Sequence, residues 1–127
     1  MKYKNFPMVP RVIFGRGSFN QMNEIIASKR LLNQAPFIFI IDDFFIGSQK
    51  IISNINLYGS DEIIYVSSQE EPKTTQIDEL VKYIKTSVSE QPAGIIGIGG
   101  GTVIDISKAV AIMLTNNGKT CDYQGWD

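Results

Sequence analysis

Residues Gly97 to Ala109 read GIGGGTVIDISKA, and this stretch decides the fold because it joins a short apolar run to the start of a helix. Three consecutive glycines, Gly99 to Gly101, lie at the junction. A strand that ends in glycines lets the backbone approach a ligand, since no Cβ stands in the way. The helix beyond it presents unpaired N–H groups and the positive end of its dipole. The junction therefore predicts an anion site, most often one for phosphate.

Thr102 suits the N-cap of this helix, and Asp105 stands three residues later, as in a capping box. A tight strand-to-helix turn, with Thr102 and Asp105 acting only as caps, is the alternative. One glycine satisfies such a turn, and each further glycine costs about 0.5–1 kcal/mol of backbone entropy. The local physics favours phosphate or dinucleotide binding. The spacing differs from the common G-x-G-x-x-G fingerprint, because Thr102 stands where the last glycine would be.

Length, charge and cysteine content bound the class of protein. The 127 residues fit one domain, residues 1–127, and the apolar content of 43% is typical of a globular chain. A net charge of −1 gives no general attraction to nucleic acid or to an anionic membrane, so we expect neither as a partner. No segment reaches the roughly 18 apolar residues of a membrane span. Cys121 is the only cysteine, which fits a reducing compartment and indicates the cytoplasm.

Histidine is absent from the sequence. Its absence removes the usual general base near neutral pH and the commonest transition-metal ligand. A self-contained Ser-His-Asp or histidine-metal site is therefore excluded in this chain, and we expect neither catalytic nor metal-binding residues within it.

Apolar runs and helical periodicities alternate along the chain. The expected strands are residues 11–15 (RVIFG), 37–41 (FIFII), 62–66 (EIIYV) and 94–98 (GIIGI), and the expected helices are residues 19–30, 46–56, 75–88 and 103–114. The run FIFII is too apolar for a half-exposed strand and suits a sheet covered on both faces. The alternation predicts an α/β fold with a doubly wound, mainly parallel Rossmann-like sheet, whose ligand lies at the carboxyl edge.

Asp42 follows the strand FIFII, and the glycine turn follows the strand GIIGI. In a parallel sheet these two strand ends can lie at one edge, which would place Asp42 and Gly99 to Gly101 around one crevice. A carboxylate there could accept hydrogen bonds from both ribose hydroxyls of an adenosine and would repel a 2′-phosphate, favouring NAD over NADP. Asp42 could equally do no more than end its strand.

Two pairs of charged residues have a structural and a functional interpretation. Asp105 and Lys108, three residues apart, can both lean toward the crevice or pair with each other, and periodicity favours the ion pair. Glu70 and Glu71 resemble a paired-carboxylate site, but adjacent side chains rarely converge, so we expect a solvated loop. Cys121, Tyr123 and Trp126 fit either a partner surface or contacts to a longer chain, and we favour the contacts.

The pattern resembles the iron-containing, group III alcohol dehydrogenase family, in its N-terminal nucleotide-binding half of a dehydroquinate-synthase-like fold. The matching pieces are PRVIFGRGSF, the strand that closes with Asp42, the E-P-K-T segment from Glu71, and GIGGGTVIDISKA, which is similar to the family's G-G-G-S-x-x-D-x-x-K. Thr102 replaces the family's usual Ser, and Glu71 stands where relatives commonly have Asn. The segments EEPKTTQIDEL and LTNNGKTCDYQGWD look most similar to the 3-deoxy-octulosonate 8-oxidase group.

The resemblance implies an oxidoreductase acting on CH–OH groups, with NAD as cofactor and a sugar acid or alcohol as substrate. It implies that Gly99, Gly100, Gly101 and Thr102 hold the pyrophosphate, Asp42 the adenosine ribose and Asp105 the nicotinamide end, while Lys108 supports the glycine turn. In this family an Asp and three His of a helical C-terminal domain bind Fe²⁺ or Zn²⁺. We expect that domain to lie outside this chain, which would be inactive alone.

The family also pairs subunits through the N-terminal strand, which makes residues Val9 to Phe14 the candidates for a homodimer contact. The competing hypothesis is a free-standing, non-catalytic nucleotide-binding module.

Overall fold

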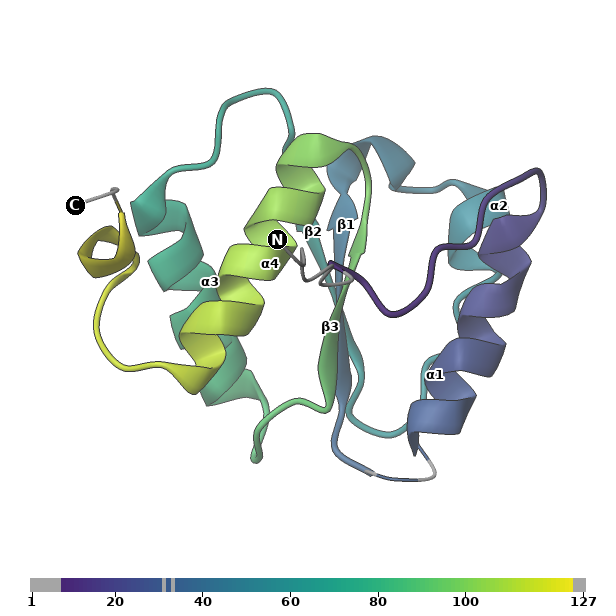
Figure 1. Ribbon diagram of the computed structural model, residues 1–127, viewed down its shortest axis with the longest axis horizontal. Coiled ribbons are helices and arrows are strands. Elements are labelled where there is room, and N and C mark those ends of the chain that lie inside the picture. Colours follow the sequence, from purple (N-terminus) through teal and green to yellow (C-terminus); the bar gives the residue numbers. More distant parts are fainter. Residues whose placement is uncertain (1–7, 31, 33, 125–127) are drawn as a thin grey trace, which may run out of the picture.

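Three parallel strands form a sheet with helices on both faces (Figure 1). The structure is a computed structural model that describes residues 8–30, 32 and 34–124. The strands are β1 (Phe37–Asp42), β2 (Glu62–Val66) and β3 (Gly94–Ile98), in the order β2-β1-β3. These are the expected strands, one of them longer by a residue, and the α/β class and the parallel sheet are confirmed.

The central strand β1 organises two apolar clusters. All six of its residues are buried, because the sheet is covered on both faces. Ile38 and Ile40 point to one face and Phe37, Phe39 and Ile41 to the other, as the period of two in a strand requires. Full burial of each such side chain stabilises the fold by about 1.5–3 kcal/mol.

The helices divide between the two faces of the sheet. Helices α3 (Thr74–Ser87) and α4 (Gly101–Thr115) cover one face, and α1 (Met22–Arg30) and the short α2 (Gln49–Ile52) cover the other (Figure 1). Three 3-10 helices, η1 (Ser18–Gln21), η2 (Asp43–Phe45) and η3 (Thr120–Tyr123), complete the elements of the described residues. Two-sided coverage of a parallel sheet is the doubly wound arrangement.

Helix α4 carries apolar side chains on nearly every side, but the other described residues bury only part of its surface. Val103, Ile106 and Val110 are fully buried, whereas Ile104 is 40% exposed and Ile112 54% exposed. Among the described residues, the sheet and α3 pack against α4 and leave these two side chains partly exposed.

Two elements differ from the sequence expectation. Residues 11–15 form no strand, and within this segment Val12 is 78% and Phe14 100% exposed, because none of the described residues pairs with it. The expected helix over residues 46–56 is reduced to Gln49–Ile52, since Gly47 has a φ of 77° and belongs to a turn.

Candidate functional site

The carboxyl ends of β1 and β3 meet at one edge of the sheet, at the top of Figure 1, where α4 begins. Ile41 pairs with Ile98, so the next residues, Asp42 and Gly99, are neighbours. A Cβ built on Gly99 would lie 3.1 Å from the Cβ of Asp42. The structure therefore confirms that the glycine turn and Asp42 share one edge.

The glycines around the turn fall into two kinds. A Cβ on Gly97 would lie 2.6 Å from Oγ of Ser107, and one on Gly99 would lie 2.9 Å from Cβ of Val103. These two glycines let α4 pack closely on β3. A Cβ on Gly100 or Gly101 would meet nothing within 4 Å, and neither residue has a positive φ. Packing and backbone conformation thus explain Gly97 and Gly99 but not Gly100 and Gly101.

The start of α4 lacks a side-chain cap. Gly100 is the N-cap, in an extended conformation with φ −80° and ψ −171°, and no side chain accepts a hydrogen bond there. The capping box expected for Thr102 and Asp105 is therefore wrong, because the helix begins at Gly101 and Thr102 already lies in its first turn. The first N–H groups of α4 stay available for an anion.

Asp42 is only 7% exposed and remains charged. Its Oδ1 accepts a hydrogen bond from the N–H of Phe44 at 3.0 Å. This bond, together with one from the Ser68 hydroxyl, holds the pKa of Asp42 below its usual value, while burial acts in the opposite direction. A side-chain hydrogen bond with Asp43 also lowers this pKa. A carboxylate has about four lone-pair sites, so these three bonds do not use all of its acceptor capacity. Asp42 is also the last residue of β1 and the N-cap of η2.

Asp105 and Lys108 form the ion pair that their spacing favours, with 3.6 Å between Oδ1 and Nζ. Their side chains are 70% and 69% exposed, so the pair contributes at most about 0.5 kcal/mol to stability. Nothing in the geometry assigns either residue to a ligand, and the roles implied by the family resemblance remain predictions.

The loop between β2 and α3 is solvated, as expected for Glu70 and Glu71. Glu70 pairs with Lys73, at 2.9 Å between Oε2 and Nζ. Glu71 lines a cavity of about 290 Å³ together with Ser67, Gln69, Glu70, Lys73 and Gln76. The two glutamates thus form no paired-carboxylate site. Sequence reasoning missed Ser68, although its place two residues beyond Val66, the β2 residue that pairs with Asp42, was a usable signal.

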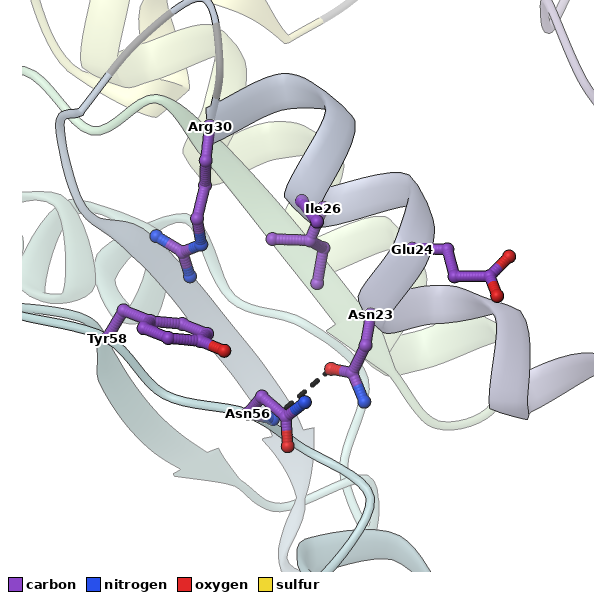
Figure 2. A pocket seen from close by; sticks show the side chains of 7 residues that line it. Asn23, Glu24, Ile26, Arg30, Asn56 and Tyr58 are labelled. Carbon is purple, nitrogen blue, oxygen red and sulfur yellow. Dashed lines mark hydrogen bonds between the residues drawn. The ribbon is translucent and has the colours of Figure 1, made fainter.

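A cavity of about 380 Å³ lies along α1, larger than the one beside Glu71 (Figure 2). Asn23 bonds to the carbonyl oxygen of Asn54 at 2.6 Å and accepts from the N–H of Asn56 at 3.2 Å. Arg30, beside Tyr58 in Figure 2, forms an ion pair with Asp61. Figure 2 also shows Glu24 extending away from the other labelled side chains. The Asn23 and Arg30 side chains are engaged within the chain, so we favour the carboxyl edge as the site.

Within the residues that the structure describes, no group of three or more His, Cys, Asp or Glu side chains is placed to hold a metal ion. The chain also has no histidine. The described residues therefore do not fit a metal centre. Over the same residues, no helix is long and apolar enough to cross a membrane. Cys121 and Tyr123 are exposed, and Trp126 lies outside the described residues.

A parallel sheet that carries a glycine turn and a carboxylate at its carboxyl edge defines a Rossmann-like domain. The sequence profile described as iron-containing alcohol dehydrogenase matches residues 9–127, and the chain belongs to this family.

Its relatives include the NAD-dependent methanol dehydrogenase of Bacillus methanolicus, 30% identical over 128 residues that cover 95% of this chain and 31% of the relative. The 1-propanol dehydrogenase PduQ of Citrobacter freundii is 32% identical over 108 residues, covering 84% of this chain and 27% of the relative. The chain thus spans about a third of the length of these relatives. The structure of sulfoacetaldehyde reductase from Bifidobacterium kashiwanohense in complex with NAD⁺ matches with a TM-score of 0.68 at 20% identity, covering 87% of this chain and 28% of that one, which confirms the fold.

Proposed function

We propose that this chain is the dinucleotide-binding part of a metal-dependent alcohol dehydrogenase or oxidase, and that it binds NAD. The observation that carries the proposal is the glycine turn: Gly100 and Gly101 leave open space at an uncapped helix start, beside the buried carboxylate of Asp42. An anion fits the first feature and a ribose diol fits the second. The NAD⁺ complex of the structurally similar reductase and the name of the methanol dehydrogenase support the same cofactor.

In this proposal Gly99 to Gly101 and Thr102 hold the pyrophosphate, and Asp42 holds the adenosine ribose. Asp105 would lie at the nicotinamide end, and Lys108 would support the turn. Bound NAD supplies the hydride acceptor for oxidation of an alcohol. The residues of this chain bind and orient it, and the negative charge of Asp42 disfavours the 2′-phosphate of NADP.

The whole enzyme would need residues beyond this chain, since the family's Fe²⁺ or Zn²⁺ would be bound in a helical domain. A reading frame that continues past Asp127 into a P-T-T-x-G-T-type segment and an Asp-x-x-x-His motif supports this arrangement, in which the present chain alone is inactive. A stop codon directly after Asp127 favours the alternative, a free-standing nucleotide-binding module without catalysis.

For the substrate we propose the C8 hydroxyl of 3-deoxy-octulosonate, an intermediate of lipopolysaccharide assembly. The support is the similarity of EEPKTTQIDEL and LTNNGKTCDYQGWD to that group of the family. The test is an oxidation assay of the complete enzyme with this sugar acid, methanol and 1-propanol. Faster turnover of either simple alcohol would contradict the sugar-acid assignment.

We further propose that the protein is a cytoplasmic homodimer that pairs through residues Val9 to Phe14. Val9, Val12 and Phe14 are 53%, 78% and 100% exposed, which suits a segment that pairs with another chain. Sedimentation analysis of the wild type and Phe14→Glu tests this contact. A wild type that stays monomeric at every concentration contradicts it.

The first experiment is a calorimetric titration of NAD⁺, NADP⁺ and ADP-ribose into the wild type and Gly100→Asp. A Cβ built on Gly100 would meet no atom within 4 Å, and Gly100 does not have a positive φ, so this variant should fold. We expect NAD⁺ and ADP-ribose to bind the wild type and not the variant, because the added carboxylate repels the pyrophosphate. Ser89→Asp, which adds the same charge in an exposed loop before β3, is the matched control and should bind normally. Equal binding by Gly100→Asp would exclude the glycine turn as the site.

A further inference from the structure

An exposed aromatic side chain, Phe44, lies two residues after Asp42 in the sequence. Phe44 is 82% exposed, although its own backbone N–H is fixed on Oδ1 of Asp42 at 3.0 Å. Ile46, two residues further on, is 62% exposed. The backbone that positions the carboxylate therefore also positions an apolar surface next to it.

The Phe44 ring packs on a second aromatic ring that is itself anchored in the core. It meets the ring of Phe45 edge to face, with centroids 5.3 Å apart and planes at 81°. Phe45 packs against the apolar cluster that contains Phe39 and Ile41 of β1. An aromatic surface that is held by the core and open to solvent needs little ordering before it binds a flat ligand.

We propose that Phe44, flanked by Ile46, is the surface on which the adenine base of the dinucleotide stacks. This inference rests on the proposed function, because it assumes that Asp42 holds the adenosine ribose. The base is attached to C1′, next to the C2′ that carries one of the bound hydroxyls, so it must lie close to the residues around Asp42. Stacking on an aromatic side chain is favourable for any nucleobase.

Exposure alone does not select Phe44, since Val12 and Phe14 are equally exposed. What separates Phe44 from them is its hydrogen bond to Asp42 and its place at the carboxyl edge, where Gly99 lies against the same carboxylate. One short segment, residues 42–46, thus offers both the acceptor for a ribose and the apolar surface for a base.

The test compares ADP-ribose with inorganic pyrophosphate, which has no base, on four proteins: the wild type, Phe44→Ala, Phe44→Tyr and Tyr83→Ala. Calorimetry measures ADP-ribose, and amide shifts in NMR measure the weaker pyrophosphate. We expect Phe44→Ala to weaken ADP-ribose about tenfold and to leave pyrophosphate unchanged. Phe44→Tyr keeps the ring and should bind ADP-ribose within about twofold of the wild type. Tyr83→Ala removes a 52% exposed ring from α3 and should bind both ligands normally.

The possible outcomes distinguish a failure of the adenine surface from a failure of the proposed function. If the wild type binds ADP-ribose, Gly100→Asp does not, and Phe44→Ala binds as well as the wild type, the adenine surface is overturned while the proposed function stands. An equal loss of pyrophosphate in Phe44→Ala also overturns it, because the ring would then support the turn and not the base. A wild type that binds neither ligand overturns both.

Discussion

The two ends of the same sheet differ in how far their polar groups are satisfied within the chain. At the amino ends of β1 and β2, the Asp61 carboxylate is 1% exposed and accepts from Arg30 and from the N–H groups of Phe37 and Tyr58. The Arg30 guanidinium also lies 4.9 Å from the ring centre of Phe37 and 5.0 Å from that of Tyr58. Among the buried side-chain nitrogen and oxygen atoms of the described residues, only Nε of Arg30 lacks a partner.

At the carboxyl ends the reverse holds. Gly100 and Gly101 border open space, α4 begins without a side-chain cap, and Phe44 exposes its ring. A charged cluster is thus not by itself a site: groups satisfied inside the chain stabilise the fold, whereas groups left open are available to a ligand. Substitutions at the amino end should therefore change stability, and substitutions at the carboxyl end should change ligand binding.

The largest effect should come from Asp61→Ala. This change leaves the mostly buried Arg30 charge and two backbone N–H groups without their acceptor, so we expect a loss of about 3–5 kcal/mol in unfolding free energy, measured by urea denaturation. The Arg30→Met, Asp61→Leu double variant removes both charges and should recover most of the loss. A single variant as stable as the wild type would show that the amino end is not a stabilising network.

The next largest effect should be a difference in stability between substitutions at Gly97 and at Gly100. Gly97→Ala forces a Cβ against Ser107 and should cost about 1–3 kcal/mol. Gly100→Ala enters open space and should change stability by less than about 0.5 kcal/mol, while it weakens ADP-ribose. Thermal melts and calorimetry of the two variants measure both quantities. If Gly100→Ala proved the less stable of the two, the open turn would be a packing feature after all.

Acid should lower the free energy of unfolding by less than Asp61→Ala does, because a protonated Asp61 side chain still fills its site. Burial raises the pKa of Asp61, but the hydrogen bonds from Arg30, Phe37 and Tyr58 outweigh it and leave the pKa below its usual value of 3.8. The folded state thus favours the charged form, so this stabilisation is complete above the unfolded pKa and is lost as the pH falls through the folded pKa. Urea midpoints from pH 7 downward should fall more steeply below pH 3.8 for the wild type than for Asp61→Asn. Parallel curves for the two proteins would refute this account.

The smallest effect is expected for Lys108→Ala. Its ion pair with Asp105 is exposed, so stability should change by no more than about 0.5 kcal/mol. If Lys108 supports the glycine turn, as the family resemblance implies, ADP-ribose should bind more weakly in this variant at unchanged stability. Unchanged affinity would leave Lys108 as a surface ion pair only.

Capping-box spacing shows where local sequence patterns are not enough to predict the structure. Thr75 and Asp78 have capping-box spacing, yet no side chain caps α3, and Asp78 accepts from both the N–H and the hydroxyl of Thr120. The same spacing failed at Thr102, where Gly100 begins the helix. A capping side chain can bond to its own helix or to a distant segment, and only the tertiary fold decides between them.

The parallel α/β fold, its three strands, and the shared edge of Asp42 and the glycine turn could all be predicted from the sequence. These follow from local patterns: apolar runs of strand length, helical periodicity, and glycines at a strand end. Only the tertiary structure decided which glycines pack and which stay open, that Ser68 and Phe44 hold Asp42, and that Asp61 closes the opposite end. The contacts of Asp42 with Ser68 and of Asp61 with Arg30 join residues far apart in the chain. The bond between Phe44 and Asp42 is short in sequence but depends on the turn that follows β1. The spacing of residue types along the chain does not contain the distances that these contacts require.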